Sequence, residues 1–251
     1  MTTPTCAICL RTYSGVWNGK KYDRVGFFKR NMKSLFAHTH IDYKLFIIDD
    51  LSGILPQLRF LDALTNHPQV EVHIKPKHLG RQHSFAWQRK LGYDSGAPYI
   101  YLCDDDYEYR DNWLRDLIEG YEVLKRNWKS RPVGCLSGFH RQGFKPDKML
   151  TYEGKQFGLT SRWLGCRWLM ARDVLGKCGY NDIKPEKGWP RNDAQKKWTS
   201  PWIDDGSYQF RMTEKYGFEH AFVQIEKPSM IEHIGTFGVH SRLKKHVWGA
   251  K

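Results

Sequence analysis

Short apolar runs alternate with segments of helical periodicity through the first half of the chain. In the segment 24–38, for example, Val25, Phe28, Met32 and Leu35 recur at the spacing of one helix face. The pattern predicts strands over residues 5–12, 45–48, 70–74 and 99–103, and helices over 24–38, 54–66, 84–92 and 112–125, the third helix ending at Gly92. This regular alternation indicates an α/β fold, in which helices flank a mostly parallel sheet.

The pattern changes after about residue 131. Short apolar pieces at 133–139, 157–164, 169–171 and 222–225 are separated by Gly, Pro and charged residues, and residues 184–202 are expected to form a long loop. A chain of 251 residues is long enough for one domain with a sizeable core. We therefore expect a single domain over residues 1–251, with a first half at 1–130 and a loop-rich second half at 131–251.

Acidic residues stand where the predicted strands end. Ligands of parallel α/β sheets bind beyond the carboxyl ends of the strands. The side chains expected to converge there are Arg11, Thr12, Asp49, Asp50, Asp104, Asp105 and Asp106. Three adjacent carboxylates repel one another, so a positive partner is expected. Asp104 and Asp106 point to the same side of an extended chain and suit a hard divalent cation, Mg²⁺ or Mn²⁺; the alternative is a solvated acidic turn.

The composition is basic. Forty Lys and Arg against 27 Asp and Glu give a formal net charge of +13, which favours association with polyanions such as nucleic acid or an anionic membrane surface. No apolar stretch is long enough to span a bilayer, and no secretory signal is visible. We expect a cytoplasmic protein with buried thiols. Cys6 and Cys9 would point to opposite faces of a strand, and no second C-x-x-C completes a zinc site.

Several segments follow one another in an order found in one enzyme family. HLGRQHSFAWQRKLGYDSGAPYIYLCDDDYEYRDNWLRDLI contains Arg89 and Gly92, an apolar strand, the D-x-D of Asp104 and Asp106, and a Trp–Leu pair that opens a helix. The other segments are LFIIDDLS, GCRWLMARDVLGKCGYND, IDDGSYQFR and EHIGTFGVHS. Over residues 5–241 the chain thus resembles glycosyltransferase family 2, the GT-A nucleotide-sugar transferases. It departs from the family pattern at Gln82, Ser84, Gln88 and Lys90, where Asn, Gly, Ala and Asn are usual.

The resemblance implies a metal-dependent transferase that inverts the anomeric carbon of a nucleotide-diphosphate sugar, with a UDP-sugar as the first choice. The cofactor would be Mn²⁺ or Mg²⁺. The candidate donor-binding residues are Arg11, Thr12, Asp50, Arg81, Asp104 and Asp105, with Arg242 as a further diphosphate contact. Metal ligands would be Asp104, Asp106 and His233, with His240 as an alternative to the histidine. Asp205 aligns with the catalytic base and Arg211 with the family's arginine. Asp204 stays an alternative base, because Ser207 replaces a second acid.

The acceptor is inferred from charge. Basic residues gather at 125–131, 184–197 and 242–251, and the middle group is interleaved with tryptophans. Lys and Arg can contact phosphates while aromatic rings stack on bases. The candidate acceptor-binding residues are Trp189, Lys196, Lys197, Trp198 and Trp202. The first hypothesis is a phage-type DNA glycosyltransferase acting on a hydroxymethylated base, in the host cytoplasm if phage-encoded. The alternatives are a transferase for polysaccharide, lipopolysaccharide or protein, and a nucleic-acid-binding protein with an inactive transferase fold.

Overall fold

The computed structural model describes residues 3–17, 20–140, 144–160, 167–180, 208–209, 211–219 and 221–235. Its centre is a nine-stranded sheet in the order β5-β4-β1-β6-β11-β8-β12-β10-β9. Four neighbouring strands are parallel, namely β5 (Val70–Ile74), β4 (Tyr43–Asp49), β1 (Cys6–Thr12) and β6 (Tyr99–Asp104). They are the four strands predicted from the first half of the chain, so the apolar runs located the parallel core of the sheet.

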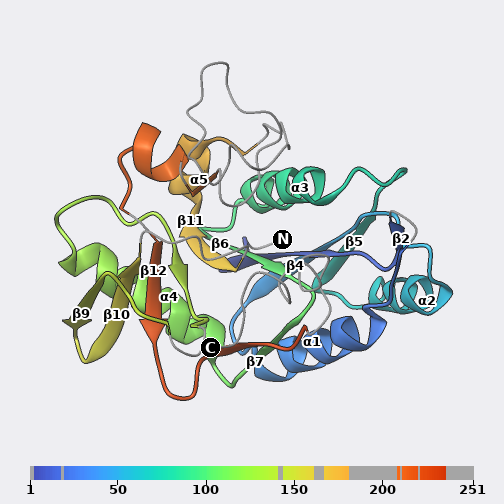
Figure 1. The fold of residues 1–251 in the computed structure, drawn as a ribbon, viewed down its shortest axis with the longest axis horizontal. Helices are drawn as coiled ribbons and strands as arrows, with labels where there is room; N and C mark the ends of the chain where they lie inside the picture. Colours follow the sequence, from blue (N-terminus) through green and yellow to red (C-terminus); the bar gives the residue numbers. More distant parts are fainter. Residues whose placement is uncertain are drawn as a thin grey trace, which may run out of the picture.

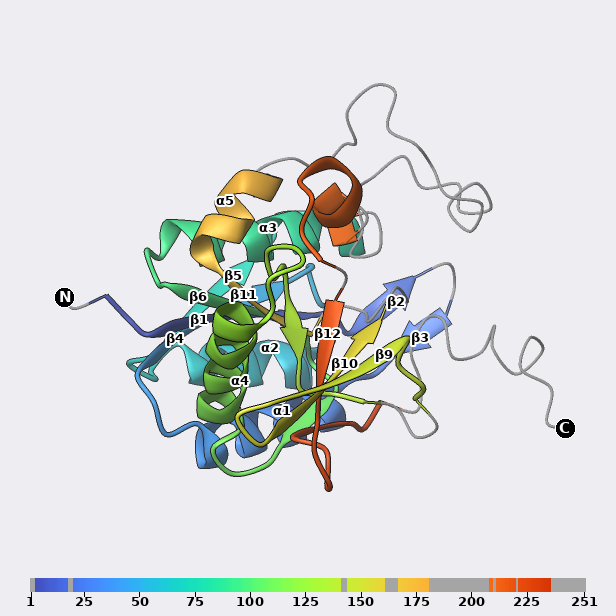
Figure 2. The same cartoon turned by 90° about the vertical axis from the view of Figure 1, so that its left-hand side faces the viewer.

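Helices cover both faces of this sheet (Figure 1). They are α1 (Val25–His38), α2 (Leu55–Leu64), α3 (Arg81–Asp94), α4 (Trp113–Asn127) and the short α5 (Arg172–Cys178). Figure 2 shows the layers from the side, with α3 and α5 above the parallel strands and α1 below them. The α/β prediction is confirmed. The prediction that Gly92 ends a helix is wrong, because α3 continues to Asp94.

The second half of the chain extends the same sheet. β11 (Trp168–Ala171) pairs antiparallel with β6, and beyond it lie β8 (Leu136–Ser137), β12 (Ala221–Ile225), β10 (Lys155–Thr160) and β9 (Lys148–Tyr152). β12 is parallel to β8, whereas β10 is antiparallel to both its neighbours. The sheet is therefore mixed: its strands are parallel from β5 to β6, and beyond β6 every pairing except that of β8 with β12 is antiparallel.

Two small sheets stand outside the main one. β2 (Gly15–Trp17) and β3 (Lys20–Tyr22) form a hairpin after β1. β7 (Tyr107–Tyr109) follows β6 and pairs antiparallel with β13 (Ile231–His233). This second pairing matters for function, because it brings the segment EHIG from the end of the described chain beside the three aspartates.

The core is built from the strands. All seven residues of β1 are buried, and so are Ile100, Tyr101, Leu102 and Cys103 of β6. Burial raises the pKa of the Cys6, Cys103 and Cys135 thiols, which keeps them protonated, as the buried-thiol prediction requires. Within the described part of the chain, no helix has both the length and the hydropathy that crossing a bilayer demands.

Candidate active site

The strand register brings the predicted polar residues to one edge of the sheet. Arg11 of β1 lies opposite Asp104 of β6, and Thr12 lies opposite Asp49 of β4. Because parallel strands end at the same edge, residues 93 positions apart can touch there. The expected convergence is therefore present for β1, β4 and β6.

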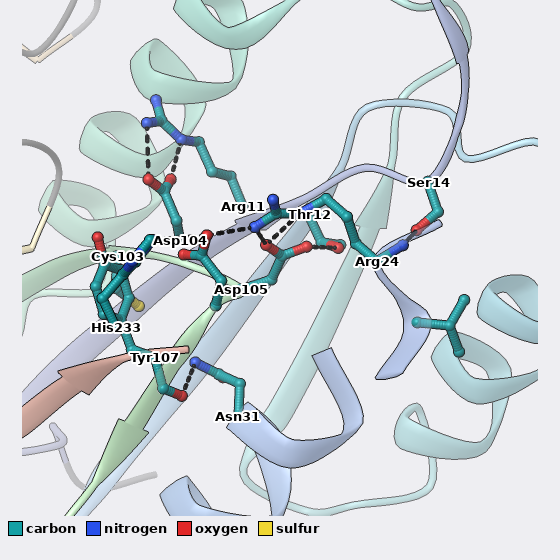
Figure 3. A network of polar contacts seen from close by, with 12 residues as sticks. Arg11, Thr12, Ser14, Arg24, Asn31, Cys103, Asp104, Asp105, Tyr107 and His233 are labelled. Carbon is teal, nitrogen blue, oxygen red and sulfur yellow. Dashed lines mark hydrogen bonds and ion pairs between the residues drawn. The ribbon is translucent and has the colours of Figure 1, made fainter. Parts of the chain in front are cut away.

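Asp104 is held by Arg11. The Nε of Arg11 donates to Oδ1 of Asp104, and its Nη2 donates to Oδ2 over 3.3 Å (Figure 3). This two-point contact is the strong form of an arginine–carboxylate pair. The Asp104 side chain is 28% exposed, compared with 2% for Asp105 and 9% for Asp106. Asp104 is thus the member of the triad that faces solvent.

Asp105 points inward. Its Oδ2 accepts a hydrogen bond from Oγ1 of Thr12 over 2.6 Å, and its Oδ1 accepts Nε of Arg24 over 2.9 Å and also Nη2 of Arg24. Burial raises the pKa of Asp105, and the charge of Arg24 opposes that shift. Asp105 is therefore bound on both oxygens by the protein itself.

Asp106 shares Arg24 with Asp105. Nη2 of Arg24 lies 2.8 Å from Oδ2 of Asp106, and Nε2 of His233 lies 3.1 Å from the same oxygen. Burial acts to raise the pKa of Asp106, but the hydrogen bond from His233 and the charge of Arg24 outweigh it and hold that pKa below its ordinary value. The other oxygen, Oδ1, is buried without a hydrogen-bond partner in the described part of the chain.

His233 reaches Asp106 through backbone pairing. β13 places His233 opposite Tyr107, and the amide of Ile234 donates to the Asp106 carbonyl over 2.9 Å. Gly235 then passes so close that a Cβ there would lie 2.3 Å from Oδ2 of Asp106. Only a residue without a side chain allows this approach. The segment EHIG is therefore fitted to Asp106.

The side chains around Asp106 have the chemistry of a divalent-cation site. An ionised carboxylate with one orphaned oxygen and a neighbouring imidazole, as at Asp106 and His233, suits Mn²⁺ or Mg²⁺. In the described ranges, no three His, Cys, Asp or Glu side chains are already gathered around one point as metal ligands. The residues fit a cation, and Asp104, whose two oxygens accept from Arg11, would be the third ligand.

Asp50 is buried, and its carboxylate contacts residues outside the triad. Nζ of Lys75 lies 2.8 Å from its Oδ1, the amides of Leu79 and Gly80 donate to its two oxygens over 3.0 and 2.8 Å, and Nδ1 of His78 lies 3.0 Å from Oδ2. Desolvation lowers the pKa of Lys75. Asp50 thus fixes the loop between β5 and α3, and its carboxylate is 5% exposed.

A second buried network joins Asp49, the last residue of β4, to the triad. Gln57 of α2 donates to Oγ1 of Thr12 over 2.8 Å and to Asp49, and accepts from Oγ of Ser14 over 2.6 Å. Asp49 also accepts the amide and hydroxyl of Ser52. Hydrogen bonds therefore run without a break from Asp49 to Asp105 through Gln57 and Thr12.

Three arginines that the sequence motifs singled out take part in contacts with the backbone. Arg81 is the first residue of α3, and its carbonyl accepts Nη1 of Arg11 over 3.5 Å. Arg89 and Arg211 are fully buried, and their Nη1 atoms donate over 3.0 Å to two consecutive carbonyls at the end of α5, those of Gly179 and Cys178. Arg211, placed by resemblance near the catalytic base, thus ties its own segment to α5.

Sequence reasoning missed Arg24, Lys75 and Gln57. Arg24 precedes α1 and is 81 residues from Asp105, so no local pattern links the two. The signal in the sequence is the charge of the triad itself, which demands a positive partner. The remaining predicted residues, namely Asp204, Asp205, Trp189, Lys196, Lys197, Trp198, Trp202, His240 and Arg242, lie outside the described residues.

Comparison with solved structures identifies the fold. The chain matches GalNAc-T7 bound to UDP, GalNAc and Mn²⁺, with a TM-score of 0.60 and 12% identity over 95% of this chain and 44% of that one. It matches a mannosyltransferase of Pyrobaculum calidifontis bound to GDP-Man and Mn²⁺, with a TM-score of 0.55 and 12% identity over 96% and 60%. It also matches TarS of S. aureus, residues 1–349, with a TM-score of 0.51 and 16% identity over 87% and 57%.

The chain has the GT-A fold. All three of these structures are GT-A glycosyltransferases, and the match includes nearly the whole chain. The chain spans roughly half of the length of each of these proteins. No family model matches it, and no curated protein matches it by sequence. In this fold Asp104, Asp105 and Asp106 lie at the carboxyl end of β6.

Proposed function

We propose that this chain is a metal-dependent, inverting glycosyltransferase that moves a sugar from a nucleotide diphosphate, a UDP-sugar as first choice, to a hydroxyl group. The observation that carries the proposal is the Asp104–Asp106 triad at the carboxyl end of β6, with His233 against Asp106, on a GT-A fold. Three neighbouring carboxylates at a ligand-binding edge are costly unless they serve a cation or a basic group.

In this proposal Asp106 and His233 would hold Mn²⁺ or Mg²⁺, with Asp104 completing the set. The cation would neutralise the diphosphate as it leaves the sugar. Arg11, Thr12 and the α3 residue Arg81 line the same edge and would orient the donor, with Asp105 holding Thr12 in place. Asp50 shapes the donor side by fixing the loop before α3.

Asp205 is our choice for the general base that removes the acceptor proton, with Asp204 as the alternative. Arg211 supports this choice, because it follows Asp205 closely in the chain and is anchored on the last turn of α5. A carboxylate on the far side of the sugar from the diphosphate gives inversion.

For the acceptor we propose a hydroxymethylated base in DNA. The formal charge of +13 supports a polyanion, and the basic, tryptophan-containing stretch before Asp205 supports contact with phosphates and bases. Trp189, Lys196, Lys197, Trp198 and Trp202 would make that contact.

The test is mass spectrometry of hydroxymethylated DNA after incubation with the protein, Mn²⁺ or Mg²⁺, and a panel of nucleotide sugars. A mass increase of one sugar per modified base is expected. Hydrolysis of the donor without DNA modification would support the transferase activity and indicate that the acceptor is a glycan instead of DNA. No turnover of any donor would leave a binding protein with an inactive transferase fold.

A further inference from the structure

Arg24 occupies the approach to Asp106. Its Nη2 lies 2.8 Å from Oδ2 of Asp106 and also contacts Oδ1 of Asp105, while Nε2 of His233 lies 3.1 Å from the same Asp106 oxygen. Oδ1 of Asp106 is buried. A cation can therefore reach this carboxylate only if Arg24 withdraws from Oδ2, or if the carboxylate rotates and breaks the same contact.

We propose that Arg24 competes with the divalent cation for Asp106, and that the guanidinium released by cation binding becomes a ligand of the donor's diphosphate. This inference rests on the proposed function. Arg24 would then be the counter-ion of Asp106 before the cation binds, and would pair with the donor's diphosphate afterwards.

The charges at the site support an exchange of this kind. Asp104, Asp105 and Asp106 carry three negative charges, and Arg11 and Arg24 supply two positive ones. A divalent cation reverses the local sign and places like charges side by side, which pushes Arg24 from Asp106. A diphosphate then offers oxygens to the displaced guanidinium, whose planar donors match phosphate geometry.

The geometry makes the movement small. The backbone of Arg24 is fixed before α1, where its amide donates to Oγ of Ser14 over 3.0 Å and its carbonyl accepts the amide of Phe28 over 2.9 Å. Nε of Arg24 is bonded to Asp105, not to Asp106. The side chain can thus give up Asp106 by turning its outer nitrogens, with Asp105 as the pivot.

The experiment tests the competition and the diphosphate contact separately. It measures the affinity for Mn²⁺ alone and the affinity for UDP in the presence of Mn²⁺. Binding of Mn²⁺ is followed by the loss of its free-ion electron paramagnetic resonance signal. Because Arg24→Gln removes the competing charge, it should bind Mn²⁺ alone about tenfold more tightly than the wild type. Calorimetry at saturating Mn²⁺ should show UDP binding about tenfold more weakly, because the variant has no guanidinium to pair with the diphosphate.

Two further variants make the result decisive. Arg30→Gln changes an exposed arginine of α1 that pairs with Glu108, and should leave both affinities unchanged. Arg24→Lys keeps the charge in case Arg24→Gln does not fold, and should bind Mn²⁺ as the wild type does, or more tightly, while losing UDP affinity. Weaker or unchanged Mn²⁺ binding by folded Arg24→Gln would overturn the competition. A wild-type protein that binds neither UDP nor GDP with Mn²⁺ would instead overturn the proposed function.

Discussion

At the scale of single residues, the three aspartates differ in how many of their carboxylate oxygens accept hydrogen bonds from the protein. Asp104 uses both oxygens on Arg11, and Asp105 uses both on Thr12 and Arg24. Asp106 alone in the triad keeps an oxygen without a hydrogen-bond partner among the described residues. Buried polar atoms are nearly always satisfied, so an exception at a ligand-binding edge points to a ligand.

Replacing Asp106 by Asn removes the charge and keeps the shape. We expect Asp106→Asn to fold normally, since its amide oxygen can still accept from Arg24, but Mn²⁺ should no longer raise the affinity for UDP. Calorimetry with and without Mn²⁺ measures this. Asp111→Asn, which changes an aspartate with a 63% exposed side chain, is the matched control. A Mn²⁺-dependent gain in UDP affinity that survives in Asp106→Asn would refute the metal assignment.

Asp50 and Lys75 form a second charged pair with a different purpose. Their side chains are 5% and 0% exposed, and two backbone amides complete the coordination of the carboxylate. Breaking such a pair from one side leaves a buried charge without its counter-ion, which costs about 3–5 kcal/mol. Lys75→Met should lower the free energy of unfolding by about that amount in urea titrations.

The comparison variant for this pair is Lys77→Met, which changes an exposed lysine two residues away. Its effect should stay within about 0.5 kcal/mol, as for most surface changes. If Lys75→Met is equally mild, Asp50 does not depend on Lys75, and the loop amides and His78 are enough to hold it.

At the scale of elements, the sequence predicted what periodicity can reveal. The four parallel strands and α1 to α4 were located because each is either a continuous apolar run or a helix with one apolar face. β2, β3, β7 and β13 were missed, because strands of three residues are too short to show alternation. The triad was placed at its strand end, but Arg24 was not assigned to it, nor Lys75 to Asp50. Long-range pairing of charges leaves no local pattern.

Gly92 illustrates how an element can be misread. A glycine after a periodic apolar segment predicts a helix end, but Gly92 lies within α3, where a Cβ would come 2.6 Å from Cγ2 of Ile100 and 3.2 Å from Sγ of Cys9. The glycine lets α3 approach β1 and β6 closely. Through the same approach, Gln88 of α3 donates to the carbonyls of Cys9 and Cys103 over 2.7 Å each.

Gly92→Ala should therefore push α3 away from the sheet and destabilise the protein by about 1–3 kcal/mol, the usual cost of overpacking. Chemical denaturation measures the loss, and Gly92→Ala/Ile100→Ala should recover part of it relative to the sum of the single changes. Gly26→Ala, in α1 with nothing within 4 Å of the added Cβ, should be neutral or stabilising by about 0.5–1 kcal/mol. Additive effects at Gly92 and Ile100 would show that α3 does not press on the strand here.

At the scale of the whole molecule, the positive charge is unevenly distributed between the site and the rest of the chain. Arg11, Arg24 and Lys75 are all committed to Asp104, Asp105, Asp106 and Asp50, so the described site is negative or balanced. The surplus that gives +13 must lie elsewhere on the chain. A single nucleotide sugar binding at the triad does not require such a surplus, whereas a phosphate backbone does.

If that surplus binds DNA, affinity should fall steeply with salt, because each phosphate that a Lys or Arg neutralises releases counter-ions. Removing one such Lys or Arg flattens the plot of log K against log salt by about 0.9 for duplex DNA. Neutralising Lys196 and Lys197 together should flatten it by up to about two units, without changing UDP affinity at the triad. Trp198→Ala should weaken transfer to DNA and leave the slope unchanged, because stacking on a base releases no counter-ions.

Fluorescence anisotropy of labelled hydroxymethylated DNA at roughly 50 to 200 mM salt measures the slope for each variant. Mass spectrometry of the DNA measures transfer. Salt-independent binding, or an affinity no better than that for a neutral oligosaccharide, would exclude DNA as the acceptor and leave the donor chemistry of the triad intact.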